Sequence, residues 1–494
     1  MFLVGLAGAA WWVTRTPAAD YQVQPTRLFE QVISHVQSFG VDSLGEAELF
    51  RRAAEGLVTE LGDEFASLTP RGERHTPSID PGGLGLQFTI RGGALIVLGV
   101  PPLSPAWRAG LESGDQIMAI DGVSVRVPNR DLILAALDGP ADSTVRLQVR
   151  RPGAGTVLDL ELRRETPRPF RVSDLVSLGQ GTYYLAIHQA GPGVAEVVGR
   201  SLRLLPAAAR GLALDLRGAG SGSLEEAAAL VDLFLAPGEP ALRVRGRDSL
   251  PKSYSAQHDL VMPAGVALAV LVSPETADAP ELLAGALQDH DRALLIGDPT
   301  FGRGVSQEEF TLSNQWVIRM STVRWETPLG RLLQMPEPGD SIALLEDRPI
   351  FATASGRPVR GGGGVVPDSV RKRLPTPPGW VELLRAVGPA FPGMLQAMDS
   401  LAVEPPGVTP SYRPTAKDLA LLLDRLKGQG IRPAQDVVEQ GAGEFGRLLG
   451  DRLVLTRLGE AGWVRRAAVL DPDLRDAVVL LRTARSPSAL VQGK

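Results

Sequence analysis

One stretch of the chain, residues 265–307, constrains the fold more strongly than any other. An unbroken apolar run at 265–272 predicts a buried strand, and a polar turn leads from it into a helix with one apolar face. A second apolar run at 293–296 predicts another strand, which ends in the glycine-containing loop at 298–304. Strand, helix and strand in this order are typical of α/β folds, whose sites lie in the loops along one edge of the sheet. We therefore expect the functional residues of this chain in the loops that flank the helix.

The composition is that of a soluble protein with several domains. The 494 residues are enough for roughly three or four domains, and 44% of them are apolar. A formal net charge of −5 gives no reason to expect a nucleic-acid partner. There are no cysteines, so a disulfide framework and a thiolate metal site are both excluded. The five histidines show no metal-ligand spacing, and we expect neither a metal nor a cofactor.

The N-terminus carries an uncharged apolar segment at residues 1–13, followed by Arg15 and a short stretch of Pro and Ala. It is too short for a comfortable membrane-spanning helix, and it is similar to the apolar core of a signal peptide or anchor that lacks a basic start. The pair Trp11 and Trp12 suits a membrane interface. We expect an exported protein, periplasmic or anchored at the outer face of the membrane. A packed or disordered N-terminus is the alternative.

A long motif surrounds the central helix. It reads Thr-Ala-Asp-Ala-Pro-Glu at 276–281, Ala-Gly-Ala-Leu-Gln-Asp at 284–289, Thr-Phe-Gly-Arg-Gly at 300–304, and Gln307. This run resembles, without gaps, the motif of the C-terminal processing peptidases, also called tail-specific proteases. The family pattern is a Ser-Ala-Ser-Ala-Ser-Glu turn, an Ala-Gly-Ala-Leu-Gln-Asp helix, and a Thr-Phe-Gly-Lys-Gly loop followed by Gln. The resemblance implies an α/β peptidase core of the ClpP and crotonase type with a serine-lysine dyad.

Two positions depart from that motif where its chemistry is concentrated. The family's nucleophilic serine falls on Asp278, and its general-base lysine falls on Arg303. A Ser-Lys dyad needs a hydroxyl that attacks and a neutral amine that accepts its proton, and arginine stays protonated at any working pH. Losing dyad members costs on the order of 10⁴–10⁶ in rate. We therefore expect an ion pair between Asp278 and Arg303 in place of a catalytic unit.

Asp278 also has a purely structural interpretation. Glu281 follows it by three residues, so the pair is expected to form an N-cap and its capping-box partner at the start of the helix. This interpretation is compatible with an inactive site. A role of Asp278 as the acid in some other reaction is the remaining alternative.

A third departure lies in the loop to which the resemblance assigns the oxyanion hole. The family has Asp-Leu-Arg-x-Asn-Pro-Gly-Gly, whereas residues 215–222 read Asp-Leu-Arg-Gly-Ala-Gly-Ser-Gly. Amide donors could survive there, but the geometry of the loop is expected to differ. The positions concerned are Ser221, Gly222 and Ala279. Gln307 aligns with a glutamine that the resemblance gives the role of orienting the family's lysine, and beside Arg303 we expect only a hydrogen-bonding neighbour.

Residues 82–168 resemble a PDZ domain. Gly-Leu-Gly-Leu-Gln-Phe at 83–88 is similar to a carboxylate-binding loop and its strand, and residues 104–117 match the family's Ser-Pro-Ala-x-x-Ala-Gly-Leu-x-x-Gly-Asp-x-Ile run. The resemblance implies that a partner's C-terminal strand is added to the sheet edge, with the loop amides around the terminal carboxylate and a preference for apolar side chains. The residues expected to bind peptide are Gly83, Leu84, Gly85 and Leu86. A PDZ fold that only packs against its neighbour is the alternative.

The whole chain is thus expected to be an α/β multidomain protein. Its expected parts are a segment similar to a signal or anchor at 1–19, an N-terminal helical region at 20–81, the PDZ domain at 82–168, the peptidase-like core at 169–375, and a C-terminal helical extension at 376–494. In the extension, Leu419, Leu422, Leu423 and Leu426 form a stripe after Thr415 and Asp418, which predicts a capped helix that packs or forms a dimer surface.

Two functions remain open. The first is a catalytically inactive homologue of the tail-specific serine peptidases that binds protein C-termini or unfolded polypeptide through its PDZ domain. It would act as a scaffold or as a regulator of active paralogous proteases, with a homo-oligomer also open. The second is an active serine-type endopeptidase with a shifted nucleophile. The residues considered for that site are Ser273, Thr276 and Ser306, with His258-Asp259 or His290-Asp291 as the base. The Asp278 and Arg303 substitutions favour the first function.

Overall fold

The computed structural model describes residues 25–63, 66–70, 80–91, 94–125, 130–153, 157–168, 171–247, 250–336, 344–370, 377–401, 407–428 and 430–492. The chain divides into two compact units, Met1–Asp63 and Glu64–Lys494. The apolar segment expected to direct export, residues 1–19, lies outside the described residues. Among the helices within the described ranges, none is both long enough and apolar enough to cross a membrane.

The first unit lies in the N-terminal region expected to be helical, where the sequence predicts two helices separated by a break at 40–42. They are α1 (Pro25–Phe39) and α2 (Glu46–Thr59), and the chain breaks between them at Gly40, as expected. Charged side chains on α2 pair along one face, where Arg51 contacts both Glu48 and Glu55. The apolar face of α1 remains about half exposed, with 52% of Leu28 and 53% of Val32 accessible to solvent.

The second unit begins, after a short strand, with the PDZ domain. Its elements are η2 (Pro81–Gly83), β2 (Gln87–Arg91), β3 (Ala94–Gly99), α3 (Pro105–Arg108), β4 (Gln116–Ile120), β5 (Val123–Ser124), α4 (Arg130–Leu137), β6 (Thr144–Arg150) and β7 (Val157–Arg163). The strands form an antiparallel sheet in the order β2-β3-β4-β6-β7, with β2 at one end. In β6 and β7 buried and exposed residues alternate strictly, because one face of the hairpin covers the domain core.

The core domain is built on a seven-stranded sheet in the order β20-β15-β14-β11-β10-β8, with β9 also paired to β10. Its strands are β8 (Arg171–Val172), β9 (Val176–Gly179), β10 (Thr182–Gln189), β11 (Gly211–Asp215), β14 (Ala267–Val272), β15 (Leu294–Gly297) and β20 (Ser369–Val370). The pairs from β10 to β20 are parallel. Helices α5 (Val194–Arg203), α6 (Leu224–Asp232) and α7 (Asp278–Asp289) cover one face through the larger residues of these strands. The α/β fold predicted from residues 265–307 is therefore confirmed.

A second sheet lies beside the first. It contains β1 (Ser67–Pro70), β12 (Pro240–Gly246), β13 (Lys252–Ser255), β16 (Val305–Thr311) and β17 (Trp316–Glu326). The shorter elements of this part of the chain are η3 (Ser313–Gln315), η4 (Leu345–Asp347), β18 (Ile350–Ala352) and β19 (Pro358–Arg360). The chain passes directly from β15 of the first sheet to β16 of the second, so the loop at 298–304 connects the two sheets.

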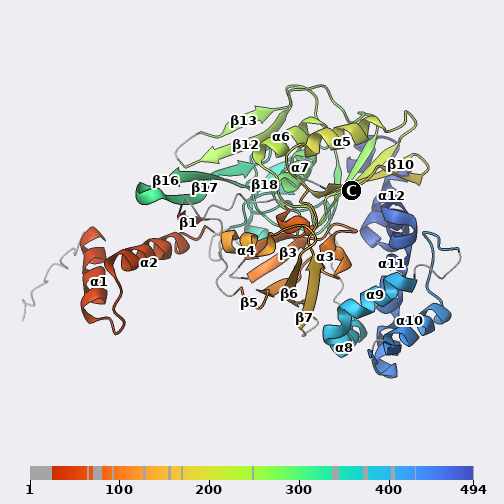
Figure 1. The fold of residues 1–494 in the computed structure, drawn as a ribbon. Helices are drawn as coiled ribbons and strands as arrows, with labels where there is room; N and C mark the ends of the chain where they lie inside the picture. The colour runs from red at the N-terminus through yellow and green to blue at the C-terminus, as the bar shows by residue number, and fades with distance from the viewer. Residues whose placement is uncertain are drawn as a thin grey trace, which may run out of the picture. The chain divides into compact units, whose positions relative to one another are not determined.

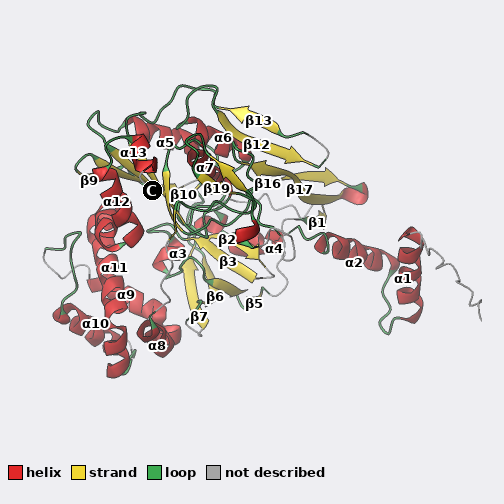
Figure 2. Cartoon of the chain, turned by 180° about the vertical axis from the view of Figure 1, so that it is seen from behind, coloured by secondary structure: helices red, strands yellow, loops and turns green. Residues whose placement is uncertain are grey.

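The C-terminal extension is helical, as expected, and its last part, from about residue 461 on, covers the other face of the seven-stranded sheet (Figures 1 and 2). Its elements are α8 (Pro378–Val387), η5 (Gly388–Ala390), α9 (Phe391–Leu401), α10 (Ala416–Gly428), α11 (Gln435–Leu470), α12 (Pro472–Thr483) and α13 (Pro487–Gln492). The sheet presents small residues to α12, among them Ala213 and Ala269, so the helix can approach closely. The capping box expected at the start of α10 is present, because Thr415 and Asp418 exchange backbone-to-side-chain hydrogen bonds.

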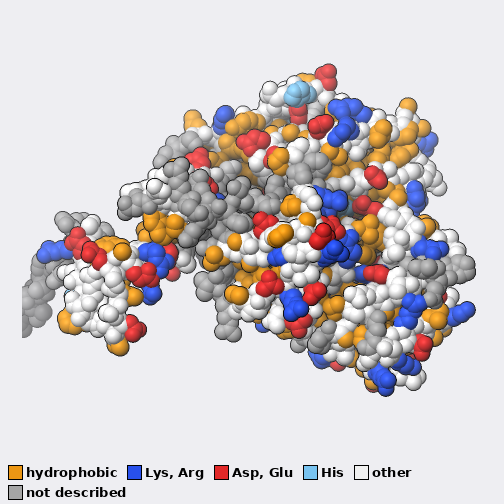
Figure 3. Space-filling model, in the orientation of Figure 1, with side chains coloured by type: hydrophobic (Ala, Val, Ile, Leu, Met, Phe, Trp, Pro, Cys, Tyr) orange, Lys and Arg blue, Asp and Glu red, His pale blue; other side chains and the backbone are white. Residues whose placement is uncertain are grey.

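The extension also holds the PDZ domain against the core. At the PDZ end, the buried Arg452 of α11 lies 4.4 Å from the centroid of the Trp107 ring and donates to the Arg108 carbonyl. Helix α11 breaks at Gly459, which has a φ of 65°, and beyond this break the chain contacts the core. There Asp471 accepts a 2.7 Å hydrogen bond from Arg217, next to the end of β11. Acidic and basic side chains are interspersed on the face of the protein seen in Figure 3.

Candidate functional site

Three loops meet at the carboxyl ends of the neighbouring parallel strands β11, β14 and β15. The loop after β14 connects to both others, because the Ala277 amide donates to the Ala219 carbonyl (2.9 Å) and the Phe301 amide donates to the Thr276 carbonyl (2.9 Å). This is the sheet edge at which the sequence placed the site, and open α/β sheets build ligand sites there. Every position assigned to the family's dyad and oxyanion hole lies in these loops or in the first turn of α7.

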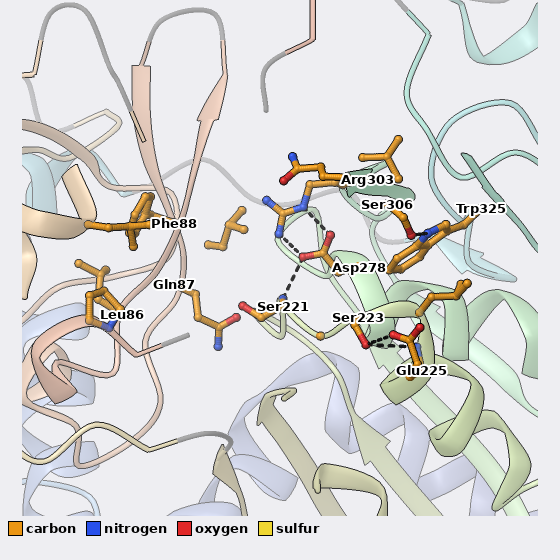
Figure 4. Close-up of a pocket in the computed structure, with 17 residues that line it drawn as sticks. Leu86, Gln87, Phe88, Ser221, Ser223, Glu225, Asp278, Arg303, Ser306 and Trp325 are labelled. Atoms are coloured by element: carbon orange, nitrogen blue, oxygen red, sulfur yellow. Dashed lines mark hydrogen bonds and ion pairs between the residues drawn. The ribbon is translucent and has the colours of Figure 1, made fainter. Parts of the chain in front are cut away.

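Asp278 is the first residue of α7, and its backbone has a φ of 56°. A non-glycine residue in this left-handed region is uncommon, and such strain concentrates at functional sites. The expected capping box is wrong: the N-cap is Ala277, and it makes no side-chain cap. The Asp278 carboxylate points away from the helix end, towards the loops from β11 and β15 (Figure 4).

The ion pair expected between Asp278 and Arg303 is present, with Arg303 buried and Asp278 partly exposed. The guanidinium Nε donates to Asp278 Oδ1 at 2.6 Å, and Nη2 donates to Oδ2 (Figure 4). Arg303 is only 6% exposed, and it also contacts Thr89 Oγ1 of the PDZ strand β2 at 3.3 Å. Its guanidinium carbon lies 5.6 Å from the centroid of the Phe301 ring. Neither member of the pair offers a hydroxyl nucleophile or a neutral amine, so the pair cannot carry out dyad chemistry.

Two of the three amides assigned to the oxyanion hole, those of Ser221 and Ala279, have acceptors within the protein. The Ser221 amide donates to Asp278 Oδ2 at 3.0 Å, and the Ala279 amide donates to the Ser221 carbonyl at 3.3 Å. Ser221 and Gly222 both have positive φ, 70° and 95°. A Cβ at Gly222 would lie 2.7 Å from the Ala279 Cβ, so the loop sits tightly on α7. The carboxylate of Asp278 thus takes the donor that an oxyanion would need.

Glu281 organises the loop that presents Arg303. It is completely buried and accepts hydrogen bonds from the amides of Gly302 (2.7 Å) and Arg303 (2.9 Å) and from the Thr300 hydroxyl. Burial raises the pKa of Glu281 to about 8, although these hydrogen bonds oppose the shift. Its sequence position suggested a helix cap, but its actual partners lie about twenty residues further along the chain.

The raised pKa of Glu281 predicts a pH-dependent stability. Between the ordinary carboxyl pKa of 4.5 and about 8 the folded protein keeps a proton that the unfolded chain has lost, so the free energy of unfolding falls as pH rises through this window. The slope approaches about 1.4 kcal/mol per pH unit. Thermal melting between about pH 5 and pH 8.5 should show a steeper decline for the native chain than for Glu281→Gln. Burial also raises the pKa of Glu112, so the readout is the difference between the two chains; equal slopes would contradict the prediction.

The predicted carboxylate-binding loop of the PDZ domain is also internally bonded. The Leu84 amide donates to the Pro81 carbonyl at 3.4 Å, and the Gly85 amide donates to the Asp80 carboxylate at 2.7 Å. Asp80 is 1% exposed and forms an ion pair with Arg171 of β8. The sequence analysis did not single out Asp80; an acidic residue directly before the glycine-rich loop is the signal that could have found it.

A cleft of about 470 Å³ connects the PDZ groove with the loops of the core. The PDZ wall is largely apolar, with Leu86, Phe88 and Leu134 among its residues, whereas the core wall is polar. The core side of the lining consists of Ser221, Gly222, Ser223, Leu224, Glu225, Asp278, Arg303, Val305, Ser306, Gln307 and Trp325. Gln307 is exposed on β16, in this wall. Both dyad positions and one of the four predicted peptide-binding positions, Leu86, therefore border one continuous space, whereas Gly83, Leu84 and Gly85 are not among its lining residues.

The alternative nucleophiles are held in structural hydrogen bonds. Ser273 Oγ accepts from the Gly218 amide, and Thr276 Oγ1 donates to the Leu216 carbonyl. Ser306 Oγ lines the cleft and accepts a 2.7 Å hydrogen bond from the Trp325 indole.

The histidines considered as bases have other partners. His258 Nδ1 lies 2.5 Å from an Asp232 oxygen, and His290 Nε2 lies 2.6 Å from the Pro240 carbonyl oxygen. These contacts do not assemble the Ser-His-Asp arrangement considered from the sequence. Within the described ranges there is no group of three or more His, Asp or Glu side chains that could hold a metal ion.

Comparison with known proteins links this geometry to a family. The model of peptidase family S41 matches residues 182–338, and a PDZ domain model matches residues 96–151. The chain is 34% identical over 252 residues to a carboxyl-terminal-processing protease of Picosynechococcus, covering 50% of this chain and 60% of the relative. It is 25% identical over 313 residues to the carboxy-terminal processing protease CtpB of Bacillus subtilis, covering 62% of this chain and 64% of the relative.

A solved structure of a C-terminal processing protease has a similar fold. The photosystem II D1 C-terminal processing protease superposes with a TM-score of 0.54 at 23% identity, covering 70% of this chain and 86% of that chain. The first three curated relatives are matched over 60%, 66% and 64% of their own lengths. The matches cover both the PDZ region and the core, the two parts that border the cleft.

Proposed function

The chain belongs to the C-terminal processing peptidase family, and from this premise we propose that it is a non-catalytic member that binds protein C-termini or unfolded polypeptide. The single observation that supports inactivity most strongly is the closed arrangement at the dyad positions. Asp278 and Arg303 neutralise each other in a part-buried ion pair, and Asp278 also accepts from the Ser221 amide. The hydroxyl, the amine and an oxyanion donor of the family mechanism are each replaced or occupied.

The cleft supports the binding part of the proposal. Strand β2 lies at the end of the PDZ sheet, and the apolar residues Leu86 and Leu134 line the cleft beside it. PDZ domains bind an extended peptide in the groove beside this strand. Residues 87–89 of β2 are buried in this structure, so a bound peptide would also use the partly exposed core wall of the cleft, where Leu224 and Val305 lie. The protein would act as a scaffold or as a regulator of active proteases of the same family. The apolar segment at 1–13 supports a location outside the cytoplasm.

Binding can be tested with a short fluorescein-labelled, unstructured peptide that ends in apolar residues. We expect saturable binding without cleavage, and Leu224→Ala should weaken the affinity about tenfold because this half-buried leucine lines the cleft and would lose apolar contact area. Leu233→Ala is the matched control, since Leu233 is also half-buried, lies at the other end of the same helix, and is not among the residues described as lining the cleft. Equal affinities of the two variants would place the peptide elsewhere.

The second candidate, a peptidase with a shifted nucleophile, has no support from the hydrogen bonds described for Ser273, Thr276 and Ser306. It predicts cleavage that persists after Asp278→Ala. Absence of cleavage in the native chain would leave the binding function as the account of this cleft.

A further inference from the structure

The acidic residue just before the glycine-rich PDZ loop affects whether the groove can bind the free carboxylate of a polypeptide C-terminus. Asp80 lies directly before η2 and is 1% exposed. One carboxylate oxygen, Oδ1, accepts the Gly85 amide at 2.7 Å. The other, Oδ2, accepts the Arg168 amide at 3.0 Å and Arg171 Nη2 at 2.9 Å. A carboxylate of the chain itself thus occupies a donor that a peptide's terminal carboxylate would use.

The loop has little freedom to release this carboxylate. The Gly83 amide donates to the Asp80 carbonyl at 3.0 Å, which closes a tight turn. Gly85 has a φ of 64°, and a Cβ at this position would lie 2.4 Å from the Ser104 Cβ. The same position is 3.3 Å from the Arg171 guanidinium carbon, so the arginine packs directly on the loop. Arg171 belongs to β8 of the core, and the core therefore braces the occupied loop from outside the PDZ domain.

The electrostatics lead to the same conclusion. A second carboxylate brought to the loop would meet Asp80, and the only cation described in contact with Asp80 is already committed to it. Arg171 Nε is also buried and has no acceptor among the described residues. The charge of Arg171 is therefore not available to a peptide carboxylate at the surface of the loop. Burying a second unpaired carboxylate is costly, since an ion taken from water needs a partner to offset its lost hydration.

We propose that this groove binds internal, extended segments of unfolded polypeptide and does not select a free C-terminal carboxylate. The inference rests on the proposed binding function and narrows its ligand. What remains for recognition is the cleft, whose partly exposed lining includes Ser221, Leu224 and Val305 and has no described group that requires a chain end. The ligand class is thus apolar polypeptide in extended conformation, with no requirement for a chain terminus.

The test compares three labelled peptides on the native full-length chain by fluorescence anisotropy. The first ends in a free carboxylate after an apolar residue, the second is its C-terminal amide, and the third carries the same apolar segment followed by a Gly-Ser extension. We expect the three dissociation constants to agree within about threefold. A PDZ domain that reads the carboxylate would lose roughly tenfold or more on amidation, because charge-assisted hydrogen bonds disappear.

Each outcome is decisive. A free-acid peptide that binds more than about threefold tighter than both others would overturn the inference and leave the proposed binding function intact. No binding of any of the three would overturn the binding function, and the inference with it. Agreement among the three peptides supports both.

A variant pair checks the physical cause. Asp80→Asn keeps an oxygen for the Gly85 amide but removes the negative charge, so it should raise the preference for the free acid at least about threefold. Asp138→Asn is the matched control, because Asp138 accepts the Gly82 amide of the same loop at 3.1 Å without touching the Gly85 donor. An unchanged preference in Asp80→Asn, with the fold intact by circular dichroism, would contradict the role of Asp80.

Discussion

Replacing Asp278 with alanine is expected to destabilise the protein by about 3–5 kcal/mol, because it leaves the Arg303 guanidinium buried without its counter-charge. Two other contacts of Arg303, with a hydroxyl at 3.3 Å and with an aromatic face, are weaker than a bidentate carboxylate. Alanine would also keep the strained φ of 56° without the polar side chain that tolerates it best. The midpoint of thermal unfolding should fall by about 5–10 °C.

A second variant separates charge from strain. Asp278→Ala/Arg303→Met removes both charges and fills the space with an apolar chain, and it should recover most of the lost stability. A midpoint for Asp278→Ala within a degree or so of the native value would mean that the pair is effectively solvated. In that case the interpretation of the site as a closed, neutralised unit would be wrong.

Leu481→Asp is expected to have the largest effect on folding, at least about 4 kcal/mol. Leu481 of α12 is 1% exposed and packs so tightly on β11 that a Cβ at Gly211 would lie 2.8 Å from its own Cβ. A carboxylate there would be buried between the helix and the sheet without a described cation beside it. Thermal melting and limited proteolysis should both report loss of the extension from the sheet.

The same helix provides the control. Val479 is 53% exposed, so Val479→Asp introduces the same charge two residues away and should change the melting midpoint by no more than about 1–2 °C. If Leu481→Asp were equally mild, α12 would not be part of the core, and the second face of the seven-stranded sheet would need another cover.

The sequence alone was sufficient to predict the fold class and the ion pair at the dyad positions. The alternation of strand, helix and strand around residues 265–307 determined both the parallel sheet and the edge at which its loops meet. Opposite charges at Asp278 and Arg303 determined their pairing, since two such groups at adjacent loops of a water-poor site have few other partners. The PDZ domain followed from a motif with fixed glycine and turn positions.

Other features depended on contacts that sequence spacing does not reveal. Glu281 stands at capping-box distance from Asp278, yet the left-handed backbone at Asp278 turns that side chain away and Glu281 bonds the loop at 300–303 instead. Asp80 was missed because its partners, Gly85 and Arg171, lie in two different domains.

The role of the C-terminal extension was predicted only in part. Its helices were expected, but their place on the sheet was not. The fully apolar strand at 267–272 indicated that both faces are covered, and the cover on the second face comes from a segment about 200 residues away in the chain. Helical periodicity shows which face of a helix is apolar but not which surface it will cover.

The central claim is that this family member binds polypeptide without cutting it, and one measurement tests it most directly. An unstructured, apolar polypeptide is incubated with the native chain and with Asp278→Ser/Arg303→Lys, and binding and cleavage are followed in parallel. The account predicts binding by both chains and no cleavage by the native one; cleavage gained by the double variant would show that the rest of the site is intact. Cleavage by the native chain that persists in Asp278→Ala would contradict the account.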